Sequence, residues 1–164
     1  MKNATLEASY MRVTVAQYSA DEVIQQFLAL YNCMDFKLEL EDIGISRFQF
    51  VRRKKVLREL RALSIALWGL ALKKSFPKDA VHFFETFRAS FPVLFPVAKE
   101  QAMMENRVNI YVDCLNAKKD MDFLPVAEYL AEVLALDADD TPRLRLRLSL
   151  ITRNLYTMIF DRLV

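Results

Sequence analysis

The residues best suited to bind another molecule are the cations between positions 47 and 61. A helix turns by about 100° per residue. Four of these cations would therefore lie within about 60° of one another on a helix: Arg47, Lys54, Arg58 and Arg61. The opposite helix face is apolar from Val56 to Leu67. Such a basic ridge could meet phosphates, an anionic membrane or an acidic protein partner. The simpler interpretation, which we favour, is a solvated face or one paired with acidic groups of the same fold.

A second candidate is a run of aromatic side chains. Its members, which step by three, four and four residues, are Phe84, Phe87, Phe91 and Phe95. Together with Met103 they could line an apolar interface, such as a dimer contact, or a ligand pocket. We expect most of them to lie in the core, because helical spacing of this kind is typical of buried faces.

Several kinds of chemistry lack the residues they need. His82 and Glu85 have helical spacing but could hold only one edge of a metal site, which needs three or four ligands. His82 is also the single imidazole that could serve a nucleophile. Gly44 and Gly69 are the two glycines, so no glycine-rich phosphate loop can form. We therefore predict no catalytic residues, no metal ligands and no cofactor.

Composition and end sequences favour a cytoplasmic protein. The hydrophobic fraction is 54% and the net charge +2, which argues against disorder. The first seven residues lack the apolar segment of a secretory signal. The longest apolar run, residues 62–72, is shorter than the about 20 residues of a transmembrane helix. Cys33 and Cys114 lie among apolar residues, and we expect both to be buried, unreactive thiols.

The elements that position these residues follow a helical period. Ser19 and Glu22 form a capping-box pattern that predicts a helix over about 21–34. A long helix is expected over about 46–75, and it is apolar on nearly every side beyond Ala62, so this half should form the centre with Trp68. Further helices are expected after Pro77, from Pro96 to Asn116, and after Asp122, with a kinked connection over 91–96.

The C-terminal segment is consistent with two structures. Residues 143–148 alternate Arg and Leu, which is a strand pattern, and segments 10–15 and 36–40 could pair with it. A helical stripe through Leu148, Ile151 and Leu155 favours a helix instead, with Thr141 as N-cap and Pro142 first in the helix after an acidic loop. We predict an all-α, single-domain bundle of about six helices over residues 1–164.

Charge is distributed in blocks along the chain. Residues 44–74 carry nine basic groups and one acidic group, whereas residues 75–142 carry 6 basic and 12 acidic groups. With no catalytic set present, we expect a non-catalytic interaction or adaptor module, either a homodimer or bound to another protein. The alternatives are a small regulator or carrier of an apolar or anionic ligand, and a nucleic-acid binder that uses the 47–61 ridge.

Overall fold

The computed structural model describes residues 18–118, 121–134 and 141–163, and all regular structure there is helical. The eight helices are α1 (Ala20–Cys33), α2 (Lys37–Asp42), α3 (Phe50–Ser75), α4 (Ala80–Arg88), α5 (Phe91–Leu94), α6 (Ala98–Asn116), α7 (Leu124–Leu134) and α8 (Thr141–Asp161). The predicted all-α fold with one long central helix is confirmed. The count exceeds six because the short helices α2 and α5 are too brief to show a helical period in the sequence.

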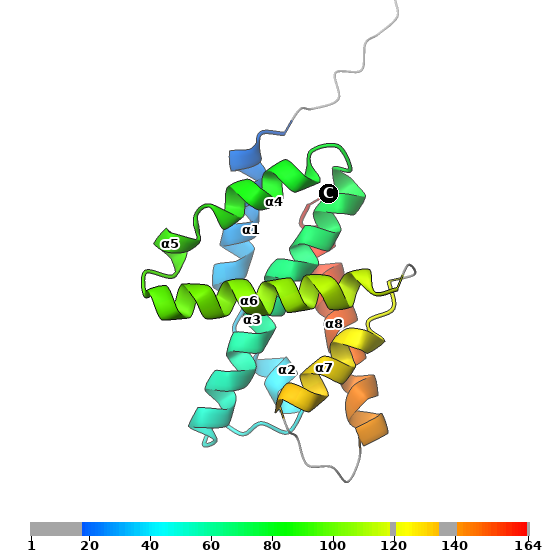
Figure 1. Ribbon diagram of the computed structural model, residues 1–164. Helices are drawn as coiled ribbons and strands as arrows, with labels where there is room; N and C mark the ends of the chain where they lie inside the picture. Colours follow the sequence, from blue (N-terminus) through cyan, green and yellow to red (C-terminus); the bar gives the residue numbers. More distant parts are fainter. Residues whose placement is uncertain (1–17, 119–120, 135–140, 164) are drawn as a thin grey trace, which may run out of the picture.

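Helix α3 is the element around which the others pack (Figure 1). It contacts α1, α4, α6, α7 and α8, and α6 crosses it near its middle. Nearly every residue from Ala62 to Leu72 is buried, as the all-round apolar pattern predicted. Trp68 is fully buried. Its ring stacks on that of Phe27 at 4.4 Å and meets the ring of Phe87 edge-on at 5.1 Å. The expected central position of Trp68 is confirmed.

The N-terminal end of α3 differs from the prediction. The helix begins at Phe50, not at about residue 46, because residues 43–49 form a turn after α2. Gly44 has a φ of 75°, a left-handed conformation that glycine adopts without strain and that ends α2. The buried Ile45 then fixes the chain to the core, and its amide donates to the carbonyl of Leu40 at 2.8 Å.

The remaining helices follow the sequence pattern closely. The capping box at Ser19 is present, and α1 buries Phe27 and Tyr31. Helix α8 includes residues 143–148 and begins at Thr141, one residue before the predicted first helical residue. Its buried residues repeat with helical spacing, so the helix is the correct alternative there. Segment 36–40 belongs largely to α2, whereas segment 10–15 and the acidic loop over 137–140 lie outside the described residues.

Candidate functional site

The structure separates the aromatic run into core and surface residues. Phe87 and Phe91 are fully buried, with ring centroids 5.5 Å apart, in the core beside Trp68. Phe95 is partly buried against Phe91, and Met103 is partly buried on α6. Phe84 alone of these five candidates lines the groove described next. The turn over Ala89–Ser90 between α4 and α5 divides the run, so it does not form one continuous face.

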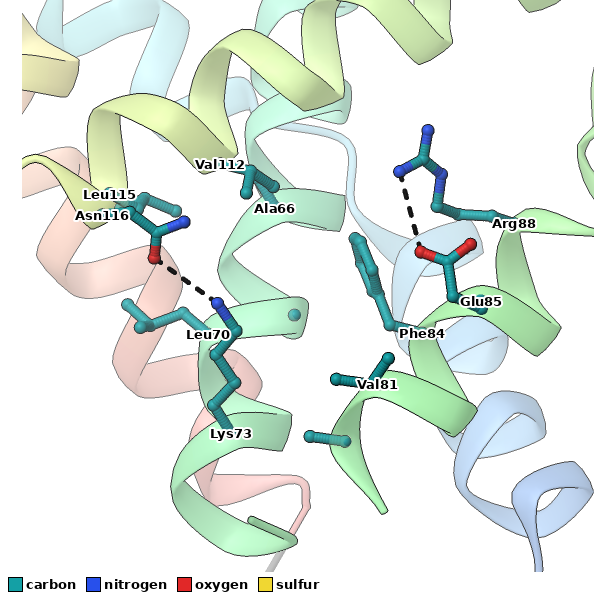
Figure 2. Close-up of a pocket in the computed structure, with 12 residues that line it drawn as sticks. Ala66, Leu70, Lys73, Val81, Phe84, Glu85, Arg88, Val112, Leu115 and Asn116 are labelled. Carbon is teal, nitrogen blue, oxygen red and sulfur yellow. Dashed lines mark hydrogen bonds and ion pairs between the residues drawn. The ribbon is translucent and has the colours of Figure 1, made fainter. Parts of the chain in front are cut away.

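An apolar groove of about 210 Å³ lies between α3, α4 and α6 (Figure 2). Its walls are formed by small and aliphatic side chains and one aromatic ring: Ala66, Gly69, Leu70, Ala80, Val81, Phe84, Val112 and Leu115. Gly69 is needed for this shape, because a Cβ at that position would stand 2.9 Å from Cε2 of Phe84. The absence of a side chain there lets the Phe84 ring lie against α3 instead of filling the groove.

Charged and polar side chains border the groove on two sides (Figure 2). On one side, Nζ of Lys73 donates to Oδ1 of Asn116 at 3.4 Å. On the other, Nη1 of Arg88 lies 3.9 Å from Oε1 of Glu85. Both interactions are long, and Lys73 and Glu85 are exposed, so each contributes little to stability. The two cations can therefore turn toward an incoming anion at low cost.

A second, more polar hollow of about 390 Å³ continues from the groove beyond Lys73 and Asn116. It is also lined by Lys74 and by Lys118, whose Nζ lies 2.9 Å from Oδ2 of Asp122. A hydrogen bond from the Leu124 amide, followed by Lys118, lowers the pKa of the Asp122 carboxyl. The two hollows share four lining residues, so together they form one elongated depression along the C-terminal half of α3.

Three residues of the predicted basic ridge lie on α3, and the fourth lies before it. Arg47 precedes α3, and its guanidinium lies 4.9 Å from the centre of the Phe48 ring. Lys54 is exposed on α3, and Arg58 is partly buried. Arg61 is also partly buried, and its guanidinium lies over the ring of Tyr31 on α1 at 5.3 Å. Of the four predicted residues, Arg47 thus lies outside α3, and Arg61 contacts α1.

A buried polar cluster that was not predicted from the sequence joins α3, α6 and α7. Glu59 is 1% exposed and accepts a 2.7 Å hydrogen bond from the hydroxyl of Tyr111. Its other oxygen, Oε1, lies 3.3 Å from Nε of Arg107, which also donates through Nη1 to the hydroxyl of Tyr129. Burial, followed by the charge of Glu59, raises the pKa of Tyr111 well above its ordinary range.

One feature of the sequence indicates this cluster: a carboxylate side chain lies within an apolar stripe. Glu59 lies between Val56 and Leu63, on the face of α3 that the sequence marks as buried. Neither hollow is lined by Glu59, Arg107 or Tyr111, so a substrate in either would not reach the carboxylate. The cluster links α3, α6 and α7 through hydrogen bonds and one ion pair.

The remaining reactive side chains are dispersed. His82 is exposed on α4. Within the described ranges no three His, Cys, Asp or Glu side chains gather closely enough to hold a metal ion. Cys114 is partly buried, but Cys33 is exposed at the last residue of α1, so the expectation of two buried thiols is wrong for Cys33. The exposed face of α1 passes through this position and includes the preceding residue, Asn32.

Comparison of the chain with protein-family models, curated proteins and solved structures gives no match. Of the helices that the structure describes, none combines the length and apolar character required to cross a lipid bilayer.

Proposed function

We propose that this protein is a non-catalytic interaction module that binds an acidic, amphipathic segment of a partner protein along the groove between α3, α4 and α6. The observation that carries the proposal is an apolar groove with Lys73 and Arg88 on opposite sides. Its volume of about 210 Å³ is below the roughly 300–1,000 Å³ of pockets that enclose a whole small ligand. It suits an apolar anchor side chain of a larger partner.

The shape and charge of the depression support a helical or extended partner. The continuation past Lys73 and Asn116 gives the depression a length that a compact ligand would not fill. Amphipathic helices bind such grooves through apolar anchors spaced one turn apart. An acidic residue beside an anchor would replace the weak contacts of Lys73 and Arg88 with close ion pairs, and Lys74 would add a further cation.

The second candidate is a carrier of a small amphipathic anion, such as a medium-chain fatty acid. It is favoured by the same pairing of apolar walls and cations, and the groove would then take the chain while Lys73 took the carboxylate. The proposal includes a cytoplasmic location, and it allows a second copy of this chain as the partner, which the oligomeric state tests.

The test is a titration of the ¹⁵N-labelled full chain with two synthetic helical peptides. Both carry the same Leu and Phe anchors, and the flanking residues are Glu in one and Lys in the other. The Glu peptide should shift the amide resonances of Gly69, Phe84 and Leu115, with an affinity at least about tenfold above that of the Lys peptide. The double substitution Lys73→Glu/Arg88→Glu should reverse this preference.

Lys99→Glu is the matched control, because Lys99 is exposed on α6 and does not line either hollow. It should leave both affinities within about twofold. No shift at the groove with either peptide would overturn the proposal. If decanoate bound in the groove and neither peptide did, the protein would be a carrier of a small amphipathic anion instead. A dimer in light scattering that Lys73→Glu/Arg88→Glu dissociates would identify the second copy as the partner.

A further inference from the structure

The turn before α3 and the first turns of that helix expose an unusual set of apolar side chains. Phe48, Phe50 and Val51 are 71%, 74% and 88% exposed. Burial of large apolar side chains is favourable, and single exposed ones are common, but three within four residues form a concentrated patch. We call residues 46–55, which include this patch, the α3 tip.

The α3 tip is also strongly basic. Its cations are Arg47, Arg52, Arg53, Lys54 and Lys55, and the segment contains no acidic residue. Lys54 and Lys55 are exposed and form no ion pair or hydrogen bond with any described residue. Arg53 is partly buried and near Asp35, whose pKa is lowered by Lys37 first and by Arg53 to a smaller degree. Arg52 has an interaction of its own, so the positive charge that the fold leaves unpaired at the α3 tip is chiefly that of Lys54 and Lys55.

This arrangement is unfavourable for the helix itself. The N-terminal end of a helix carries partial positive charge, so nearby cations destabilise it and acidic residues would stabilise it. Helix α3 has no acidic residue in its first turn, and Gln49 at the N-cap forms no capping hydrogen bond with its side chain. Natural sequences break such local rules mainly where a site has another role.

The α3 tip is separate from the groove proposed above. Val51 and Gly69 are 18 positions apart on α3, or about 27 Å along its axis at 1.5 Å per residue. Figure 1 shows the start of α3 at the same end of the bundle as α7 and the start of α8, beyond the crossing of α6. A large flat surface can therefore approach the α3 tip without contact with α4 or α6.

We propose that the α3 tip docks on the surface of an anionic lipid bilayer. Phe48, Phe50 and Val51 would enter the boundary between headgroups and acyl chains, as the apolar face of an interfacial helix does. The surrounding Lys and Arg side chains would contact the lipid phosphates and carboxylates, whose negative surface potential attracts basic clusters. Aliphatic stems of Lys54 and Lys55 allow their ammonium groups to stay at headgroup level.

A bilayer fits these residues better than a nucleic acid does. Recognition of single strands depends on open aromatic faces on which bases stack. Val51, the most exposed of the three side chains, has no such face, and the guanidinium of Arg47 already lies over the Phe48 ring. Insertion in lipid needs only apolar area, which all three side chains supply.

The test is sedimentation of the full chain with phosphatidylcholine vesicles, with and without about 30% phosphatidylserine. Phosphatidylserine should strengthen binding at least about tenfold, and a rise in salt from about 0.1 M to about 0.5 M should remove most of the gain. Two variants should each lose about tenfold or more: Phe48→Ser/Phe50→Ser/Val51→Ser and Lys54→Glu/Lys55→Glu. All five positions are exposed, so both variants should keep the thermal transition of the parent.

Matched controls lie away from the α3 tip. Val93→Ser/Val97→Ser removes exposed apolar side chains, and Lys78→Glu/Lys99→Glu removes exposed cations. Both should bind vesicles within about twofold of the parent.

A fluorescence experiment tests insertion directly. In the variant Phe50→Trp, the emission of the indole at position 50 should shift to the blue on phosphatidylserine vesicles, because insertion removes water from around the ring. Binding that does not depend on phosphatidylserine, or that the triple Ser variant retains, would overturn the proposal. Tighter binding of a single-stranded oligonucleotide than of vesicles, lost in the same variants, would replace the bilayer with nucleic acid.

Discussion

The hydroxyl of Tyr111 on α6 donates a 2.7 Å hydrogen bond to the carboxylate of Glu59 on α3, and both side chains are buried. This bond links the central helix to the helix that crosses it. Arg107 supplies the counter-charge for Glu59 and reaches partly into solvent. A carboxylate in this position is tolerated only while its partners remain, since an unpaired buried charge is costly.

The first prediction concerns this bond. Tyr111→Phe keeps the ring but removes the donor, so Glu59 loses one of its two partners. We expect the free energy of unfolding to fall by about 1–3 kcal/mol, measured by urea denaturation. Tyr129→Phe is the control, because Tyr129 is partly buried and contacts Arg107 rather than the carboxylate. An unchanged urea midpoint for Tyr111→Phe would show that the bond contributes nothing.

The second prediction concerns stability at alkaline pH. Burial, with the charge of Glu59, raises the pKa of Tyr111, and burial raises the pKa of Tyr31 and Tyr156. A tyrosine whose pKa is raised in the folded state stabilises the fold. This stabilisation is fully present at any pH below the pKa of the tyrosine in the unfolded chain, which is near 10.0. That stabilisation is lost as the pH rises above this value, because only the unfolded chain then releases the proton. The thermal midpoint should therefore fall as the pH rises above about 10. For Tyr111 the free energy of unfolding should decrease by about 1.4 kcal/mol per pH unit in this range.

The measurement is a set of thermal melts between about pH 8 and 12, with tyrosinate absorbance as a second signal. Tyr111→Phe should make the alkaline decline shallower, whereas Tyr18→Phe, at an exposed position, should not. Equal slopes for the two variants would contradict the role assigned to Tyr111.

The third prediction concerns Gly69 and Phe84. Gly69→Ala gains up to about 1 kcal/mol of helix propensity, but its methyl group would stand 2.9 Å from Cε2 of Phe84. The ring must then move toward the groove. We expect Gly69→Ala/Phe84→Leu to be more stable than the sum of the single changes by about 0.5–2 kcal/mol. If the changes in the free energy of unfolding, measured by urea denaturation, were additive across this double-mutant cycle, residue 69 and the Phe84 ring would not interact sterically.

The fourth prediction concerns the two thiols. Cys33 is exposed, whereas Cys114 is partly buried, and desolvation followed by the charge of Asp113 raises the pKa of the Cys114 thiol. The thiolate is the reactive form, so Ellman's reagent should react in a fast and a slow phase at neutral pH. Cys33→Ser should remove the fast phase alone. A single rate for both thiols in the parent would be inconsistent with this structure.

The fifth prediction uses the single tryptophan, Trp68, as a reporter of the core. Phe27→Ala removes the ring that stacks on Trp68 at 4.4 Å, and should cost about 3–5 kcal/mol. Phe48→Ala, at an exposed position of the α3 tip, should stay within about 0.5 kcal/mol of the parent. Emission of Trp68 during urea unfolding measures both variants. If Phe27→Ala and Phe48→Ala lowered the free energy of unfolding by similar amounts, Phe48 would pack against the rest of the protein in solution.

The sequence alone determined where most helices lie. The capping box at Ser19 and the apolar period through Leu148 and Ile151 depend on residues within one or two turns. Both can therefore be recognised in the sequence without knowledge of the fold. The same is true of the apolar second half of α3, which can be satisfied only by burial. These local features specified an all-α bundle around a long central helix.

Only the tertiary structure decided which side chains meet. Glu59 and Tyr111 are 52 positions apart, and no local pattern indicates that two helices cross there. The turn at Gly44 moves Arg47 off the ridge, and the turn between α4 and α5 directs Phe91 into the core while Phe84 borders a groove. Periodicity describes one helix at a time, whereas grooves and buried ion pairs arise from the angles at which helices pack against one another.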